Sequence, residues 1–205
     1  EEIMNQIIKN TIILFVITLV AGICLGTVHD ITLDPIAQAQ EAAATKTYQE
    51  VYPDAASFDE PQELADAVTA AADSISEWGF GKVTINDAKE ALDASGNQIG
   101  YLITSTSAES YGGNVQIAVG ITNEGELTGI GFLSISDTPG LGMRAKEPDF
   151  KDQFIGKKAE NLEVTKTGAS ADNQIEAISG ATITSKAVTN ATDAAIYFVA
   201  NCLAQ

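Results

Sequence analysis

A run of eighteen residues without a charge, from Thr11 to Val28, constrains this chain more than any other feature. As an α-helix the run is roughly 27 Å long, because each residue adds about 1.5 Å, and that length is close to the thickness of a bilayer core. The sequence therefore predicts a cytoplasmic stub and a transmembrane helix in residues 1–28. Lys9 before the run, with His29 and Asp30 after it, favours a cytoplasmic N-terminus and a main domain on the outer side of the cell membrane.

Two other fates of this segment fit the sequence less well. A cleaved signal peptide needs a cleavage site close to its apolar run, and the tripeptide Ala37-Gln38-Ala39 lies well beyond it. A lipoprotein site at Cys24 needs a small residue where Ile23 stands. We therefore expect a retained, single-pass anchor.

The composition narrows the functional classes. The 205 residues carry a formal net charge of −17, which would repel a phosphate backbone, so no nucleic-acid partner is expected. The two cysteines, Cys24 and Cys202, are far apart and predict neither a disulfide framework nor a metal or Fe–S site. The single histidine, His29, has no neighbouring residues that would form a catalytic triad or dyad with it. We expect no catalytic side chains, so chemistry in this chain would depend on a bound cofactor.

Residues 29–80 are predicted to form a connecting helical segment. An Ala-rich stretch from Ile36 to Val51 has apolar residues near helical spacing and ends before Pro53. Apolar positions from Phe58 to Val68 predict a second, short helix.

From Lys82 to Ile135 the apolar residues recur with the period of a β-strand. Hairpin-type turns separate the segments, so we expect a mostly antiparallel sheet. Glycines at 125, 129 and 131 would weaken an ordinary strand and predict a bulge or the close approach of another group. The predicted strands are Val83–Ile85, Ala88–Leu92, Ile99–Ser105, Val115–Thr122 and Leu127–Ser134.

After the sheet, the sequence predicts a loop, two helices and one further strand. This part of the chain begins with a loop too rich in glycine and proline for regular structure, Asp137–Ala145. The elements predicted beyond this loop are a helix around Pro148–Ile155, a strand at Leu162–Thr165 and a helix over Ser185–Leu203 with an apolar stripe. Together with the sheet they predict an α+β domain over residues 81–205, with helices flanking a mostly antiparallel sheet.

Two irregular loops combine glycines with hydroxyl residues: TPGLG at Thr138–Gly142 and SGAT at Ser179–Thr182. Glycines let a backbone approach a ligand closely. The second loop precedes the C-terminal helix, where free N–H groups and the helix dipole favour a phosphate. By itself SGAT is more often an ordinary turn and N-cap, whereas the two motifs together are far more selective.

The run IAVGITNEGELTGIGFLSISDTPGLG, followed by ISGATITS, resembles the FMN-binding domain shared by two membrane proteins. These are the G subunit of the Rnf electron-transport complex and the C subunit of the sodium-pumping NADH:quinone reductase. The N-terminal membrane helix, the Ala-rich helix and the segment YPDAASF at Tyr52–Phe58 also fit that family. The resemblance covers nearly the whole chain, and its overall length favours the Rnf protein.

The resemblance implies a covalent FMN. In the family, the FMN phosphate is esterified to the last residue of an Asp-x-x-Ser/Thr-Gly-Ala-Thr/Ser motif, which is Thr182 in this sequence. Glu176 stands where the motif often has aspartate, so the carboxylate is kept and one methylene is added. The cofactor-binding residues that the resemblance implies are Thr182, Ser179, Gly180, Ala181, Glu176 and Thr184 at the attachment site, and Thr138, Pro139, Gly140, Leu141 and Gly142 in the other loop.

Several nearby residues have two interpretations. Thr184 and Ser185 either contribute to the site or cap the helix. Met143 and Arg144 either contact the cofactor or serve as a core contact and a surface charge. Lys186 either approaches the phosphate or is solvated, and Trp78 either stacks on a ring or belongs to the core.

These inferences predict a membrane-anchored flavoprotein that relays electrons through FMN. The resemblance implies that it works in the Rnf ion-translocating ferredoxin:NAD oxidoreductase, with the membrane, the other proteins of that complex and a flavin transferase as partners. The alternatives are the corresponding flavoprotein of the sodium-pumping quinone reductase, a flavin-free anchor or assembly module, and an outer flavin reductase that acts alone. The coupling ion and the immediate electron donor and acceptor are not encoded in recognisable motifs.

Overall fold

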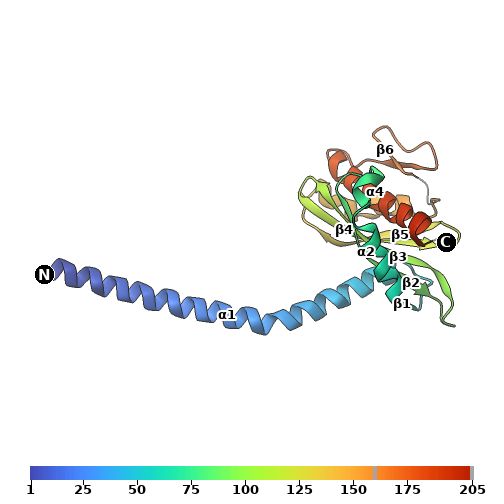
Figure 1. Ribbon diagram of the computed structural model, residues 1–205. Coiled ribbons are helices and arrows are strands. Elements are labelled where there is room, and N and C mark those ends of the chain that lie inside the picture. Colours follow the sequence, from blue (N-terminus) through green and yellow to red (C-terminus); the bar gives the residue numbers. More distant parts are fainter. Residues whose placement is uncertain (159–160, 204–205) are drawn as a thin grey trace. The chain divides into compact units, whose positions relative to one another are not determined.

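The computed structural model describes residues 1–158 and 161–203 (Figure 1). They form two compact units, Glu1–Ala44 and Thr45–Gln205. The first unit is the larger part of helix α1 (Glu2–Val51), and the second holds the last turns of α1 and all other elements. Those are β1 (Ser57–Asp59), α2 (Gln62–Ala71), β2 (Val83–Leu92), β3 (Gln98–Ser110), β4 (Gly113–Thr122), β5 (Leu127–Ile135), α3 (Pro148–Lys151), β6 (Glu163–Thr165), β7 (Gln174–Glu176) and α4 (Thr182–Phe198), with short 3-10 turns at Ile75–Trp78, Gly142–Lys146 and Asp152–Phe154 and a π-helical end at Val199–Leu203.

Helix α1 joins the predicted membrane helix and the Ala-rich helix into one element. Its most apolar 18-residue window has a mean hydropathy of 2.6 and none of it is buried, so α1 is long and apolar enough to cross a membrane. The hydroxyls of Thr11, Thr18, Thr27 and Thr32 each donate to a backbone carbonyl of the preceding turn. Polar atoms in the apolar stretch are therefore satisfied inside the helix, which a lipid environment requires.

The second unit is built on a five-stranded sheet in the order β1-β2-β3-β4-β5, with every neighbouring pair antiparallel. The predicted strands are confirmed, except that Val83–Ile85 and Ala88–Leu92 form one strand, β2. Their pairing with β3 shifts register between Ile85 and Asp87, which explains the interruption of the sequence pattern. The fold class is the expected α+β, with one small parallel pair, β6 and β7, beside the main sheet.

The predicted helix at Phe58–Val68 was wrong at its start. Phe58 belongs to β1, where it lies opposite Ala91 of β2, and α2 begins only after Pro61. Pro61 has a φ of −65° and extended backbone, so it separates the strand from the helix. The C-terminal helix also begins three residues earlier than the predicted Ser185, because Ser185 N–H already bonds to the carbonyl of Ala181 at 3.0 Å.

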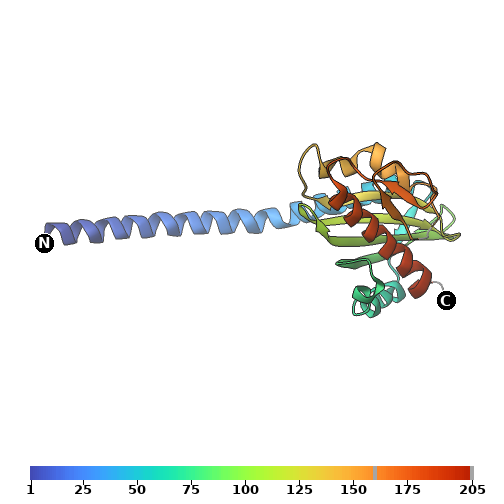
Figure 2. The same ribbon diagram turned by 90° about the horizontal axis from the view of Figure 1, so that it is seen from above.

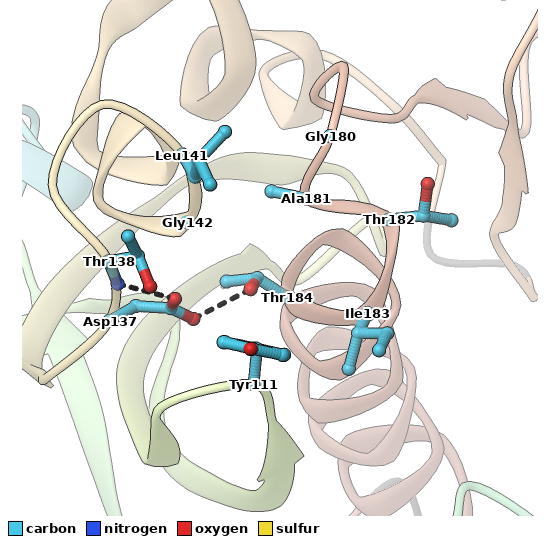
Figure 3. Close-up of a pocket in the computed structure, with 10 residues that line it drawn as sticks. All are labelled: Tyr111, Asp137, Thr138, Leu141, Gly142, Gly180, Ala181, Thr182, Ile183 and Thr184. Carbon is cyan, nitrogen blue, oxygen red and sulfur yellow. Dashed lines mark hydrogen bonds between the residues drawn. The ribbon is translucent and has the colours of Figure 1, made fainter.

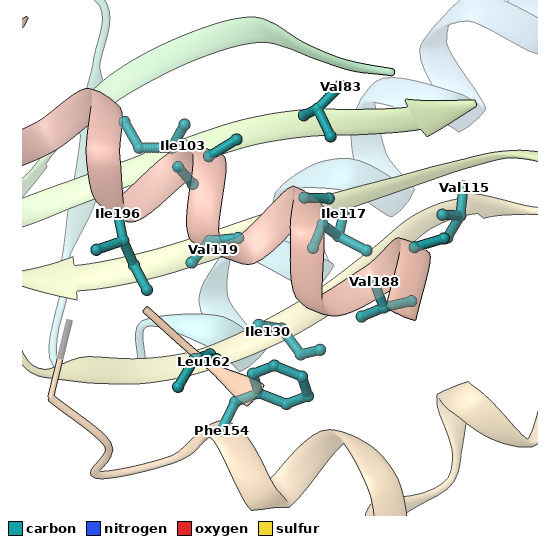
Figure 4. Close-up of a cluster of buried hydrophobic side chains, with 14 of the residues drawn as sticks. Val83, Ile103, Val115, Ile117, Val119, Ile130, Phe154, Leu162, Val188 and Ile196 are labelled. Carbon is teal, nitrogen blue, oxygen red and sulfur yellow. The ribbon is translucent and has the colours of Figure 1, made fainter. Parts of the chain in front are cut away.

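Helix α4 covers one face of the sheet and crosses β3 and β4 in Figure 2. Strand residues such as Ile103, Ile117 and Val119 are fully buried against Val188 of α4 and against Phe154 (Figure 4). This face is the main hydrophobic core of the second unit.

The last turns of α1 cover the opposite face of the sheet. Val51 packs with Leu102 and Ala118, and its carbonyl accepts a 2.7 Å hydrogen bond from the Thr128 hydroxyl. A Cβ at Gly131 would lie 2.5 Å from methyl carbons of both Thr47 and Val51, so glycine lets the helix approach β5 closely. The predicted close approach is confirmed at Gly131, whereas a Cβ at Gly129 would meet its nearest atom only at 3.6 Å.

Candidate functional site

The two glycine-containing loops meet in one pocket of about 500 Å³, although more than thirty-five residues separate them in the chain. The sheet and α4 bring them together, because the first loop follows β5 and the second leads into the first turn of α4. Figure 3 shows the two loops facing each other across the pocket. The pocket is lined by Tyr111, Asp137, Thr138, Leu141, Gly142, Gly180, Ala181, Thr182, Ile183 and Thr184.

A carboxylate holds the inner wall of the pocket together. Asp137 Oδ2 accepts hydrogen bonds from the Thr184 hydroxyl at 2.7 Å and from the Ser110 hydroxyl at 2.9 Å, and Oδ1 accepts one from Thr138 N–H at 2.6 Å. Burial alone would raise the pKa of Asp137, but the hydrogen bonds from Thr184, Thr138 and Ser110 outweigh burial and lower that pKa below its usual value. Asp137 is therefore ionised at neutral pH.

The four hydroxyls of the SGATITS run have different surroundings. Thr184 is fully buried and donates to Asp137, while Ser185 is fully buried, donates to Ala181 carbonyl and accepts from Ile178 N–H. The side chains of Ser179 and Thr182 form no hydrogen bond with any residue in the described ranges. Thr182 lines the pocket and Ser179 does not, so Thr182 is the one residue of these four that both lines the pocket and has an unengaged hydroxyl.

Helix α4 supplies donors at the same place. Its first backbone hydrogen bond from a helical N–H is the one from Ser185 to Ala181. The N–H groups of Thr182, Ile183 and Thr184 precede that bond, and the first N–H groups of a helix have no acceptor within the helix. An anion in the pocket would therefore meet free donors and the positive end of the helix dipole.

Exposed apolar side chains also gather at the pocket. Tyr111 is 71% exposed, Ile183 55% and Leu141 42%. In the described part of residues 45–205 only two further large hydrophobic side chains, Ile155 and Tyr197, are exposed. Three apolar side chains left in water around one cavity indicate a ligand with an apolar surface.

The structure brings together seven of the eleven predicted site residues in this pocket: Thr138, Leu141, Gly142, Gly180, Ala181, Thr182 and Thr184. Pro139 and Gly140 belong to the same loop but do not line the pocket. Glu176 and Ser179 line a neighbouring hollow instead, beside Gln153. The Glu176 carboxylate is exposed there, and its backbone N–H donates to Gln153 Oε1 at 2.7 Å.

The residues with two interpretations lie outside the pocket lining, apart from Thr184. Trp78 packs on Tyr197 with ring centroids 4.7 Å apart, and Met143 packs against the main core. Arg144 pairs with Glu147 at 3.2 Å, and Lys186 is exposed. Capping is not the role of Thr184, because its hydroxyl donates to Asp137. Ser185, in contrast, does bond the loop backbone in front of α4.

Sequence reasoning missed Tyr111, Asp137 and Ile183 as lining residues. Asp137 immediately precedes TPGLG, and an aspartate before a glycine loop is a usual partner for backbone N–H groups, so it had a detectable signal. Tyr111 lies in the β3–β4 turn. The pairing of the two strands brings this turn to the pocket, and no local sequence motif marks it. In the described part of the chain, no three His, Cys, Asp or Glu residues are placed to hold a metal ion.

Two family models and several relatives match this chain. A model described as FMN-binding domain matches residues 110–197, and one described as RnfG N-terminal region matches residues 3–51. The G subunit of the Na(+)-translocating ferredoxin:NAD(+) oxidoreductase complex of Acetobacterium woodii is 35% identical over 95% of this chain and 92% of its own length. The G subunit of the proton-translocating ferredoxin:NAD(+) oxidoreductase complex of Clostridium ljungdahlii is 30% identical over 96% of this chain and 93% of its own.

Among solved structures, the C subunit of the Na(+)-translocating NADH-quinone reductase of Parabacteroides distasonis aligns with a TM-score of 0.44 at 19% identity. The alignment covers 70% of this chain and 95% of that chain. A score below 0.5 does not establish a common fold, so the family assignment depends on the sequence relatives.

Proposed function

The chain belongs to the RnfG family of ion-translocating oxidoreductase proteins, and we propose that it relays electrons in such a complex through an FMN esterified to Thr182. The relatives' names place them in ferredoxin:NAD(+) oxidoreductases, so we assign this chain to the same reaction. The names differ in the transported ion, Na⁺ in one and the proton in the other.

The pocket fits FMN in size and in chemistry. Its volume of about 500 Å³ falls in the range of small-molecule sites, about 300–1,000 Å³. Tyr111, Leu141 and Ile183 offer apolar surface to a flavin ring, and the first turn of α4 offers N–H donors to a phosphate. The Asp137 carboxylate would repel a phosphate, but it already accepts hydrogen bonds from three donors, which partly offset its negative charge.

One observation carries the assignment of the attachment residue. Of the four hydroxyls in SGATITS, Thr182 alone both lines the pocket and makes no hydrogen bond within the described residues. A hydroxyl that is already a donor in a buried network loses that bond when it is esterified, which costs about 1 kcal/mol or more. Thr182 loses nothing of this kind. Small neighbours, Gly180 and Ala181, leave room for a transferase and a phosphate.

A flavin dinucleotide can donate the FMN phosphoryl group to Thr182. A bond forms between Thr182 Oγ1 and the FMN phosphorus, the pyrophosphate bond of the dinucleotide breaks, the nucleoside monophosphate leaves, and the hydroxyl proton goes to solvent. Bound FMN supplies the redox chemistry. The chain's own residues bind its phosphate, surround its ring with apolar side chains and keep it at the membrane.

We further propose that α1 anchors the protein with its N-terminus in the cytoplasm and the flavin domain outside, as Lys9 before the apolar run indicates. The division into an anchor at 1–28, a connecting segment at 29–80 and an FMN domain at 81–205 stays a prediction. Protease added to intact cells should remove the flavin domain. Protection of that domain until the membrane is broken would contradict the proposed orientation.

The test of the attachment site is co-expression of the full chain with a flavin transferase, followed by denaturing electrophoresis. We expect a fluorescent band whose Thr182 peptide gains the mass of FMN minus water. Thr182→Ala should abolish the fluorescence, Thr182→Ser should restore it, and Ser179→Ala should leave it unchanged, because Ser179 does not line the pocket. A dark wild-type band would overturn the proposal and favour a flavin-free anchor module.

A further inference from the structure

The Asp137 carboxylate is the meeting point of three separate parts of the fold. Its donors are Ser110 at the end of β3, Thr138 in the glycine loop and Thr184 in the first turn of α4. Figure 3 shows the carboxylate between the loop and the helix, with the bonds from Thr138 and Thr184 drawn. Hydrogen bonds to an ionised acceptor are roughly twice as strong as neutral ones, so this arrangement connects the three parts firmly.

The surrounding backbone is shaped to admit this carboxylate. A Cβ built on Gly142, the last residue of TPGLG, would overlap the Asp137 carboxyl atoms. A Cβ on Gly112 would lie 2.7 Å from Asp137 Cα and would overlap the carbonyl oxygen of Ser136. Any side chain at either glycine would displace the Asp137 segment. The final glycine of TPGLG therefore makes room for Asp137.

We propose that Asp137 is the positioning residue for flavin attachment: through Thr184 it fixes the rotation of the first turn of α4, and with it the direction in which Thr182 presents its hydroxyl. This inference rests on the proposed function. Residues two apart on a helix point in nearly opposite directions, since each residue advances about 100°. With Thr184 held toward Asp137, Thr182 points away from the carboxylate, as Figure 3 shows. Esterification of Thr182 then leaves the bond from Thr184 to Asp137 intact.

The experiment measures the initial rate of flavin transfer to the full-length chain in detergent, with purified transferase and flavin adenine dinucleotide. Asp137→Asn keeps the shape and removes the charge, and Thr184→Val keeps the shape and removes the donor. Thr184→Ser restores a hydroxyl. The matched control is Thr192→Val, because Thr192 is another fully buried threonine of α4 whose hydroxyl bonds only to the carbonyl of Val188.

We expect Asp137→Asn and Thr184→Val to slow the transfer by about tenfold or more, since small misplacements of a reacting group cost rates of this size. Thr184→Ser should return to the wild-type rate, and Thr192→Val should transfer at that rate even though it melts at a lower temperature. After complete labelling, the midpoint potential of the flavin in Asp137→Asn should be more positive than in the wild type, because one negative charge has left the pocket.

The outcomes separate the two proposals. If the wild-type chain takes up no flavin on Thr182, the proposed function fails. If the wild type is labelled and both Asp137→Asn and Thr184→Val are labelled as fast, the positioning role alone fails. Slowing by Thr192→Val equal to that by Thr184→Val, at equal loss of melting temperature, would also overturn it, because the effect would then follow from stability.

Discussion

The body of helix α4 and the first two residues of the helix, Thr182 and Ile183, differ in burial and in hydrogen bonding. From Ala187 to Phe198 nearly every side chain is buried, and even the polar ones are satisfied. In the first turn, Ile183 is 55% exposed, and the Thr182 hydroxyl has no hydrogen bond to any described residue. The body of the helix is thus explained by the fold, whereas the exposure of Ile183 and the unengaged hydroxyl of Thr182 are not.

This difference indicates which residues work for function. A buried core residue needs only packing as its reason, but an exposed isoleucine beside a free hydroxyl and a glycine loop has no stabilising role in the fold. If the distinction is correct, changes in the body of α4 alter stability and spare flavin transfer in the folded fraction. Changes at Thr182 and Ile183 do the opposite.

The largest effect on stability is expected in the body. Phe198→Ala removes a fully buried aromatic side chain from the main core and should cost about 3–5 kcal/mol of unfolding free energy. Chemical denaturation of the full chain measures this value. The fraction that remains folded should accept flavin at the wild-type rate. Loss of transfer in that fraction would show that the two regions are not independent.

In the body of α4, we also expect the contribution of Asp193 to stability to depend on pH. Burial of Asp193 in α4 raises its pKa to about 7, and the hydrogen bond from Leu162 N–H at 2.9 Å lowers it only in part. Above about pH 4 the unfolded chain has lost this proton while the folded chain keeps it until about pH 7. The carboxyl therefore makes the wild type progressively less stable as pH rises through this window, and the loss levels off above pH 7.

Asp193→Asn tests this sign, because the amide oxygen still accepts from Leu162 and carries no charge. The stability gain of the variant over the wild type should grow by about 3 kcal/mol between pH 5 and pH 8. Denaturation curves at the two pH values provide the measurement. A gain that is constant with pH, or one that shrinks, would show that Asp193 is ionised in the folded chain.

Much of the fold was predictable from the sequence because its signals are local. The alternation of apolar and polar residues predicted strands β2 to β5, and the uncharged run predicted the apolar part of α1. The short strand β1 was missed, since three residues give no readable period and Phe58 also fits a helical pattern. Its pairing with β2 is a tertiary effect that no local pattern records.

The site was predictable in part for the same reason. The two glycine loops were visible as motifs, and the structure places both at the pocket. Asp137 was overlooked because its function depends on Ser110 and Thr184, residues 27 and 47 positions away. Glu176 was predicted beside the attachment residue from the motif alone, but in the structure it lines the neighbouring hollow and not the pocket.

Gly180→Ala should have a smaller effect on stability and a clear effect on transfer. Gly180 has a φ of +79°, so alanine there costs about 1–2 kcal/mol, and its Cβ would lie 3.1 Å from Leu141 Cδ2 across the pocket. Gly168→Ala is the matched control, because Gly168 has a φ of +89° and nothing near its Cβ. Both variants should lose similar melting temperature, and only Gly180→Ala should slow flavin transfer. Equal transfer rates would place Gly180 outside the functional region.

The smallest effect on stability is expected at Ile183. Its side chain is mostly in water, so Ile183→Ala should change the unfolding free energy by no more than about 0.5 kcal/mol. If the side chain covers the flavin ring, its removal should make the attached flavin more accessible to quenching by iodide. Ile155→Ala is the control, because Ile155 is 56% exposed and does not line the pocket.

Iodide quenching of the labelled chain therefore distinguishes two explanations for the exposure of Ile183: contact with a bound flavin ring, or an ordinary surface position. Quenching that rises in Ile183→Ala and stays at the wild-type level in Ile155→Ala would assign the exposure of Ile183 to a bound ring. The same quenching in all three chains would mean that Ile183 is an ordinary surface residue. In that case the functional part of the first turn of α4 would reduce to the Thr182 hydroxyl and the backbone N–H groups around it.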